Sequence, residues 1–311
     1  MKLVLLFSAL PIVRTFKPNV HPGSSSVTLS SLRLRLQNNR SLSFNNRFLS
    51  RSVNNNTDNN MSDFKRAKLD DSVSEKVIGT HSGSFQADEA MGCFILRQLP
   101  EYRFSKIVRS RDPKVLETCD IVIDVGGVYD HEKSHYDHHQ RGYDERFDAG
   151  KEGSKEGRCT KLSASGLVYR HYGKEVIKTY YPSLSNEHLD FAYLKLYNSL
   201  LEALDAIDTG VEMTTGEHVY RDSTGLSSRV GRLNPRWNEV DDEGKSPDSD
   251  ERFMEASKLC GEDFLSVMTK IIESDLPARE IVEKAVLKRH ETDPSGEIIC
   301  FPTGGLPWKG T

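Results

Sequence analysis

The chain after residue 75 alternates short apolar runs with turns and amphipathic segments. The run "KVIG" at 76–79 predicts a buried strand, and residues 88–99, after a Gly/Ser turn, predict a helix. The apolar side chains of that helix recur at helical spacing: Met91, Phe94, Ile95 and Leu99. Another strand in "FSKIVRSRDP", a short helix in "DPKVLETCD" and a strand over 121–125 continue this order. Such repeats predict an α/β fold with a mainly parallel, Rossmann-like sheet flanked by helices.

Longer helices are predicted in the second half of the chain. The segment "TKLSASGLVYRHYG" predicts a helix opened by small hydroxyl residues, and a long amphipathic helix starts at about Asn186 and ends in "DAIDTG". An acidic loop over 241–252 reads as exposed. We expect two more helices after it, at 253–274 and 277–290, and then a strand within "EIICFPTGGLPW".

The first 57 residues differ from the rest in composition. They contain eight basic residues and no acid, with Ser, Asn and Leu between them. This composition predicts a mitochondrial transit peptide over 1–60, followed by a linker over 61–75. A tail without a targeting role and a secretory signal in "LVLLFSALPIV" are the alternatives. Initiation at Met61 would give a second, nuclear or cytosolic form, since the basic cluster "KRAK" follows it.

Removing the leader makes the remaining chain acidic. The whole chain has a net charge of −4 and the leader carries +8, so residues 58–311 carry −12. A broad basic surface for nucleic acid is therefore not expected, and a polyanionic substrate would be held locally. Five scattered cysteines without a C-x-x-C pair argue against a disulfide scaffold. No apolar run reaches the roughly 18 residues of a membrane span, so no membrane partner is expected.

Candidate chemistry gathers where the predicted strands end. His81, Asp88 and Asp124 lie at strand ends or in the turns after them, where parallel α/β sheets bind their ligands. Asp124 ends an apolar run, and a buried carboxylate needs a cation or hydrogen bonds. Asp88 taken alone would also fit a charge at a helix start. The pattern therefore indicates a site at this edge of the sheet.

The stretch "YDHHQRGY" adds Asp137, His138 and His139 in direct succession, which indicates a metal site when combined with the acids at the strand ends. Asp205 and Asp208 end the long helix, where negative charge opposes the helix dipole, so a cation would explain their placement. The helix start in "TKLSASG" can bind an anion, or it can be an ordinary serine cap.

Six ordered stretches from residue 76 onward resemble the DHH phosphoesterase superfamily: "GTHSGSFQADEA", "IVIDVGGVYD", "YDHHQRGY", "TKLSASGLVY", "DAIDTGV" and "SRVGRLNPRWN". The chain is most similar to the Myg-type (melanocyte-proliferating-gene) branch of metal-dependent hydrolases. The resemblance implies two divalent ions, Mn²⁺ or alternatively Mg²⁺, about 3.5–4 Å apart, which activate a water for attack at phosphorus. Mixed carboxylate and imidazole ligands suit manganese.

The resemblance also implies roles for individual residues. Asp124 would bridge the two ions, and His81 would bind one of them. Asp88, His139 and either Asp208 or Asp205 would bind the other. His138 would either support a metal ligand through a hydrogen bond or face the phosphate, and Asp137 would orient a histidine. Phosphate or substrate contacts are expected from four further residues: Arg141, Lys161, Ser163 and Ser165.

Two departures from the family pattern affect these expectations. Gln86 stands where the family usually has a histidine ligand, and its neutral amide would weaken one metal site. The chain also ends at "GLPWKGT", where relatives continue into a long C-terminal section. We therefore expect a DHH-like metal-binding domain over 76–235 and a partial, C-terminally truncated second α/β domain over 236–311.

The predicted function is that of a metal-dependent phosphodiesterase, namely a 3′–5′ exonuclease on short or single-stranded RNA. One alternative keeps the site but acts on a small phosphoester or pyrophosphate. Another is a regulatory or binding homologue that has lost activity through Gln86 and the shortened chain. RNA or a short oligonucleotide is the expected partner in the enzymatic readings, and the sequence leaves protein partners open.

Overall fold

A computed structural model gives the fold, and it describes residues 4–7, 75–147 and 158–309. The predicted leader and linker lie outside the described residues, apart from Val4–Phe7 and Glu75, and so does Met61. Strand β1 (Val4–Phe7) pairs in parallel with β7 (Ile298–Phe301). Within the described part of the chain, no helix is long and apolar enough to cross a membrane.

The main sheet has five strands in the order β3-β2-β4-β6-β5. Their bounds are β2 (Val77–Thr80), β3 (Lys106–Arg109), β4 (Ile121–Ile123), β5 (Tyr129–Asp130) and β6 (His135–Tyr136). All neighbours are parallel except β5, which is antiparallel to β6. The predicted α/β class with a mostly parallel sheet is therefore confirmed.

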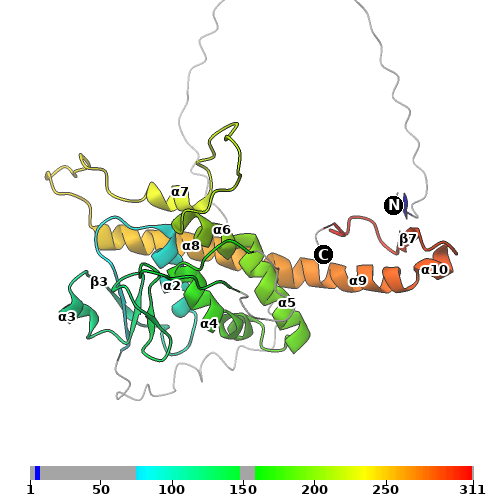
Figure 1. Cartoon of the computed structure of the whole chain (residues 1–311), viewed down its shortest axis with the longest axis horizontal. Helices are drawn as coiled ribbons and strands as arrows, with labels where there is room; N and C mark the ends of the chain where they lie inside the picture. Colours follow the sequence, from blue (N-terminus) through cyan, green and yellow to red (C-terminus); the bar gives the residue numbers. More distant parts are fainter. Residues whose placement is uncertain (1–3, 8–74, 148–157, 310–311) are drawn as a thin grey trace, which may run out of the picture. The chain divides into compact units, whose positions relative to one another are not determined.

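Helices surround this sheet, and α2 lies in the middle of them. The first four are α2 (Ala87–Leu96), α3 (Pro113–Leu116), α4 (Ala164–Tyr180) and α5 (Asn186–Leu196). Helix α2 packs against α4 and against α8 (Ser249–Lys270), which runs beside it in Figure 1. Glycines permit both contacts, because Gly92 of α2 lies close to Ser165 and Val168 of α4, and Gly261 of α8 faces the ring of Phe94.

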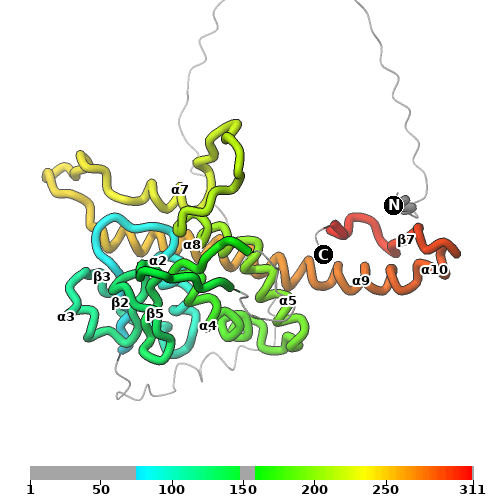
Figure 2. The backbone as a smooth tube through the Cα atoms, in the orientation of Figure 1, coloured from blue at the N-terminus to red at the C-terminus, as the bar shows by residue number. Residues whose placement is uncertain are grey.

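The helical run that starts at Asn186 contains a π-helical turn between two α-helices. Helix α5 continues into a π-helical turn, η1 (Tyr197–Leu201), and then into α6 (Glu202–Asp208). The run that starts with α8 likewise passes through a π-turn, η2 (Ile271–Asp275), into α9 (Leu276–Leu287) and α10 (Arg289–Thr292). A π-turn adds a residue and shifts the side chains after it around the helix axis. Figure 2 shows α7 (Leu226–Gly231) between two long loops.

One hydrophobic core joins these elements. It contains Ile78 and Ile123 from the sheet, Met91 from α2 and Leu167 from α4. Phe253 and the other buried side chains of α8 belong to the same core, although α8 begins after residue 236. The predicted division of the body into two domains at 235–236 stays a prediction.

Candidate metal centre

Two predicted site residues follow neighbouring parallel strands at one edge of the sheet. His81 comes directly after β2, and Asp124 comes directly after β4. His81 Nε2 lies 3.4 Å from Asp124 Oδ2, so the sheet brings these side chains together. Asp124 has a φ of 55°, in the left-handed region that Asp and Asn adopt more readily than most residues. The backbone thus turns sharply at the point where the carboxylate is needed.

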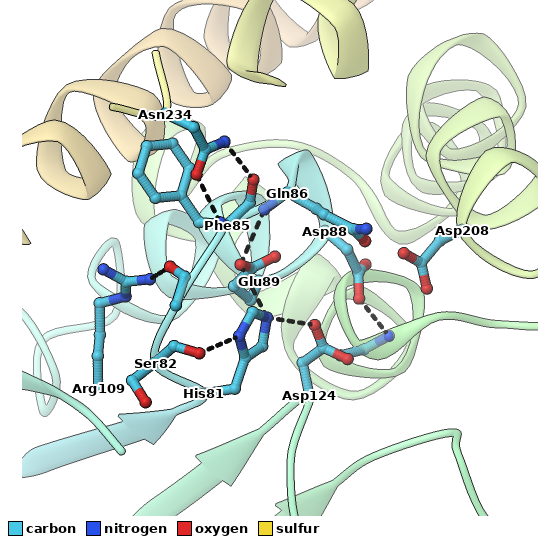
Figure 3. Close-up of polar contacts among 12 residues, drawn as sticks. His81, Ser82, Phe85, Gln86, Asp88, Glu89, Arg109, Asp124, Asp208 and Asn234 are labelled. Carbon is cyan, nitrogen blue, oxygen red and sulfur yellow. Dashed lines mark hydrogen bonds and ion pairs between the residues drawn. The ribbon is translucent and has the colours of Figure 1, made fainter. Parts of the chain in front are cut away.

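The start of α2 supplies the next two carboxylates. Asp88 and Glu89 lie in its first turn, and both are almost fully buried. Glu89 Oε1 accepts a hydrogen bond from the backbone N–H of Gln86 at 2.9 Å and pairs with His81 Nε2 at 3.0 Å. The side chain of Gln86 is exposed. Figure 3 shows His81, Glu89 and Asp124 pointing toward one another beneath this helix start.

The turn after β6 positions Asp137 and the two histidines. Asp137 Oδ2 accepts the Gly127 N–H at 2.5 Å, and its Oδ1 accepts the His138 N–H at 2.7 Å. The same Oδ1 lies 2.6 Å from His139 Nδ1, which is the contact that an orienting carboxylate makes. The side chain of His138 is 7% exposed and that of His139 is 63% exposed. Only His138 therefore points into the protein interior.

The two histidines point in different directions, although both belong to the group Asp124–Asp137–His138–His139. His138 Nε2 lies 2.9 Å from Asp208 Oδ2 and 3.4 Å from Asp124 Oδ1, and it forms a cluster with Asp88 and Asp208. His139 Nδ1 is 3.7 Å from Asp124 Oδ1 and belongs to a cluster with Asp137. The sequence cannot distinguish adjacent histidines, because their directions depend on how the turn after β6 folds.

Asp205 and the serines form a separate buried network beside the centre. Asp205 Oδ1 accepts hydrogen bonds from the N–H of Ser163 at 2.9 Å and from its hydroxyl at 2.7 Å. Its Oδ2 accepts the Tyr197 hydroxyl at 2.7 Å, and burial raises the pKa of Asp205 to about 7. Of the two aspartates at the end of the long helix, only Asp208 reaches the cluster of His138 and Asp88.

The N-terminus of α4 binds the carboxylate of Asp88. The N–H groups of Ala164 and Ser165 donate to the two oxygens of Asp88 at 2.9 and 2.8 Å, and the Ser163 hydroxyl oxygen also lies within hydrogen-bond distance of this carboxylate. Ser163 and Ser165 are fully buried. Their backbone and side-chain donors therefore position Asp88, one of the candidate ligands.

The remaining predicted contacts lie at the surface. Lys161 Nζ donates to the Tyr143 carbonyl at 2.9 Å and lies 3.8 Å from Asp144. Lys161 lines a cavity of about 410 Å³ together with both histidines, which we call the lysine cavity. Arg141 is exposed in the turn after His139. It is not among the residues lining the three cavities that open at the centre.

Three overlapping groups of side chains have the composition and spacing of metal ligands. They are His81–Glu89–Asp124, Asp88–His138–Asp208 and Asp124–Asp137–His138–His139, and the ligand atoms within each group lie within 4.8 Å of one another. Three of these buried atoms lack a well-directed hydrogen bond among the described residues: Glu89 Oε2, Asp124 Oδ1 and His138 Nε2. The last two have only ion-pair contacts, since His138 Nε2 lies 3.4 Å from Asp124 Oδ1 and 2.9 Å from Asp208 Oδ2. Buried polar atoms are costly to leave unpaired, so these residues fit divalent cations.

The electrostatics of the centre also favour cations. Burial alone would lower the pKa of His81 and His138, but Asp124 and the other nearby carboxylates raise both to about 10. Burial, together with the charges of Asp208 and Asp124, raises the pKa of Asp88 well above its usual value. These side chains retain their protons when no metal is bound. Metal ions would bind to the same side chains and displace the protons.

Three contributors to the site are absent from the sequence-based prediction. Glu89 lies in the first turn of a helix, where an acidic residue is favoured by the helix dipole, so the sequence does not reveal its role in the site. Arg111, in the loop after β3, places Nη2 3.2 Å from His81 Nδ1. Asn234 exchanges two hydrogen bonds of 2.8 Å with the backbone of Phe85 and so fixes the loop between His81 and α2 (Figure 3). The motif "RLNPRW" was the available signal for Asn234.

Comparison with known proteins gives consistent matches. The family model MYG1_exonuc, described as an uncharacterised protein family (UPF0160), matches residues 77–311. The MYG1 protein C27H6.8 of Caenorhabditis elegans is 46% identical over 234 residues, which cover 75% of this chain and 66% of the relative. The MYG1 exonucleases of Bos taurus and Homo sapiens are 44% and 43% identical, over 75% of this chain and 60% of each relative. The chain thus spans less than two thirds of these relatives. No solved structure shows a significant match.

Proposed function

Because the chain belongs to the MYG1 exonuclease family (UPF0160), we propose that it is a metal-dependent phosphodiesterase, a 3′–5′ exonuclease on short or single-stranded RNA. The supporting observation is that two carboxylate–imidazole groups share a single residue, Asp124, at the carboxyl edge of the sheet. A shared carboxylate is what a pair of closely spaced ions requires. We assign the sheet to the DHH type on the same grounds.

The proposed ligands fall into two sets. One ion would be bound by His81, Glu89 and Asp124, and the other by Asp88, His138 and Asp208. Asp124 would also face the second ion, because its Oδ1 lies 3.4 Å from His138 Nε2. Oxygen and imidazole ligands of this kind suit Mn²⁺. When bound, such ions lower the pKa of a water and neutralise charge on the phosphoryl oxygens. Gln86 has a neutral, exposed amide and would be a poor ligand. Glu89 supplies an anionic oxygen to the first set of ligands instead.

His139 is the residue of the centre that meets the substrate in this proposal. It lines all three cavities and is the most exposed member of the ligand groups. Asp137 holds its Nδ1 at 2.6 Å, which fixes the ring and leaves Nε2 toward the cavities. His139 can therefore donate a hydrogen bond or a proton to an oxygen of the phosphate.

A second candidate function has support from the size of the cavities. They measure about 400, 330 and 410 Å³, and residues 58–311 carry a net charge of −12. Both facts favour a small phosphoester over a long polyanion. The chain spans 60–66% of the three relatives named above, so the RNA substrate and the 3′–5′ direction are part of the proposal.

The test is Mn²⁺-dependent degradation of single-stranded RNA labelled at the 5′ or the 3′ end by the full chain. Asp124→Asn should abolish it, and Asn is the better replacement than Ala because it tolerates the left-handed backbone. Asp242→Asn removes an exposed acid elsewhere and should leave the rate unchanged. Loss of the 3′ label first supports the direction.

Three outcomes would count against the RNA proposal. Hydrolysis of dinucleotides or pyrophosphate without RNA degradation would favour the small-substrate reading. Degradation that persists in Asp124→Asn at the parent rate would place the chemistry elsewhere. Inactivity of the parent with activity in Gln86→His would mean that the chain is a homologue with one weakened metal site.

A further inference from the structure

The centre opens on one side into a cavity whose lining extends beyond the proposed ligands. This cavity, the arginine cavity, has a volume of about 330 Å³ and is lined by Arg111, Asp124, Gly126, Gly127, Asp137 and His139, among others. It shares Gln86 and His139 with the cavity of about 400 Å³ on the other side. A substrate bound across Gln86 and His139 would therefore extend into both cavities.

The walls of the two cavities differ in chemistry. The larger one includes Phe85, Leu204 and Ile207, and Ile207 is 62% exposed, so it offers an apolar surface beside Asp208. The arginine cavity is lined mainly by polar residues and by the two glycines of the Gly126–Gly127 turn. A Cβ added at Gly126 or Gly127 would meet nothing within 4 Å, so this turn leaves room for a ligand to approach the backbone.

Arg111 enters the arginine cavity from the loop after β3. Its Nε donates to the Ser82 carbonyl at 3.1 Å, and Nη2 lies 3.2 Å from His81 Nδ1. The residue is exposed, and no carboxylate among the described residues lies within 4 Å of its guanidinium. A guanidinium has five N–H donors in a planar fork. Most of them remain available, and the contact with Ser82 fixes the direction of the fork.

The charges of the centre require such a cation. Five carboxylates gather there (Asp88, Glu89, Asp124, Asp137 and Asp208), and two divalent ions would neutralise four of their charges. A phosphodiester brings a further negative charge into the same space. Arg111 is the one permanently charged cation that lines the arginine cavity, and Lys161 of the lysine cavity is bound to Tyr143 and near Asp144.

We propose that Arg111 and the Gly126–Gly127 turn form the phosphate-binding subsite of this centre. The guanidinium would donate to the phosphate oxygens of a nucleotide whose nucleoside lies in the apolar cavity beyond Gln86 and His139. Arginine suits this task because its fork matches two phosphate oxygens at once. The inference rests on the proposed function, since it takes a nucleotide as the ligand.

The experiment uses binding, so that it does not depend on turnover. The full chain is loaded with Mn²⁺, and the affinity for adenosine 5′-monophosphate is measured by titration calorimetry, with adenosine as the ligand lacking phosphate. Arg111→Gln should weaken the nucleotide by about 10- to 100-fold, which corresponds to the loss of one or two charged hydrogen bonds. Adenosine affinity should not change, and Arg111→Lys should recover part of the loss.

Two matched variants make the result specific. Arg103→Gln removes the same charge at the opposite end of β3 and should bind the nucleotide like the parent. Arg141→Gln tests the exposed arginine near the histidines. A loss in Arg141→Gln without one in Arg111→Gln would overturn the assignment. So would a parent chain that binds the nucleotide no better than adenosine.

Metal binding separates a direct contact from an indirect one. Arg111 touches His81, so Mn²⁺ stoichiometry and affinity are measured for each variant in the absence of nucleotide. Unchanged Mn²⁺ binding in Arg111→Gln supports the phosphate contact, whereas an equal loss of Mn²⁺ would overturn it in favour of a role in positioning His81. If the nucleotide binds through Arg111 but no phosphoester is hydrolysed, the proposed function fails while the subsite stands.

Discussion

The substitution Gly166→Ala tests whether the buried network behind the centre matters. Gly166 lies in the first turn of α4, and a Cβ added there would be 2.7 Å from Asp205 Cγ and still closer to both carboxylate oxygens. Ordinary contacts begin at about 3.4 Å, so the carboxylate of Asp205 would have to move by about 1 Å. Asp205 is fully buried and held by Ser163 and Tyr197, so it has no free space to enter.

The size of the effect follows from the bonds that would be lost. The Asp205 carboxylate accepts three hydrogen bonds of 2.7–2.9 Å, each contributing about 1–1.5 kcal/mol. Against this loss, alanine is favoured over glycine in a helix by about 1 kcal/mol. The net destabilisation is about 2–4 kcal/mol. In a chain of this size that lowers Tm by about 5–15 °C.

Thermal unfolding by circular dichroism measures this change, and Gly231→Ala in α7 is the control. A Cβ at Gly231 meets nothing within 4 Å, so this variant should melt within about 2 °C of the parent. Ser163 also holds Asp88, so Gly166→Ala should weaken Mn²⁺ binding as well. The reasoning is refuted if Gly166→Ala melts at or above the parent temperature.

Three further predictions concern packing, pH and metal binding. Gly261→Ala should lower the free energy of unfolding by about 1–3 kcal/mol, because its Cβ would lie 2.6 Å from Phe94 Cζ. Urea titration measures this change, and an unchanged midpoint would contradict the packing of α8 on α2. Burial and the neighbouring His131, whose ring centroid lies 3.7 Å from that of His171, lower the pKa of His171 to about 4. The folded state therefore resists protonation of His171. Stability from this group is complete above pH 6.5 and is lost as the pH falls from 6.5 to 4, by about 1–2 kcal/mol after allowance for partial exposure. The urea midpoint of His171→Gln should fall less than the parent's between pH 7 and 5, and parallel decreases would refute this. Glu89→Gln should reduce bound Mn²⁺ from two ions to one by calorimetry, and two tight ions in the variant would exclude Glu89 as a ligand.

The longer helices and strands could be predicted from the sequence because they contain enough residues to show a hydrophobic period. The predicted strand at 76–79 is β2 shifted by one residue, and the helix predicted over 88–99 is α2. Strands β5 and β6 have two residues each, too few to show a period, so the sequence pattern missed them. The π-turn Tyr197–Leu201 was missed for another reason, since it inserts one residue into a helix that otherwise reads as continuous.

The family was also accessible from the sequence, and the match over residues 77–311 confirms it. Six motifs in fixed order carry that information because each is a local string of residues. The direction of a side chain is not local. Which of Asp205 and Asp208 reaches the centre depends on the π-turn and on Tyr197, which binds Asp205 and keeps it buried.

The sequence by itself determined that carboxylates and histidines follow the strands of a parallel sheet, because chain order and residue type suffice for that. The tertiary structure alone decided that His138 faces Asp208 while His139 faces solvent. It also decided that Glu89 joins the ligands and that Arg111 enters the cavity beside them. These assignments depend on contacts between segments distant in sequence, and only packing brings those segments together.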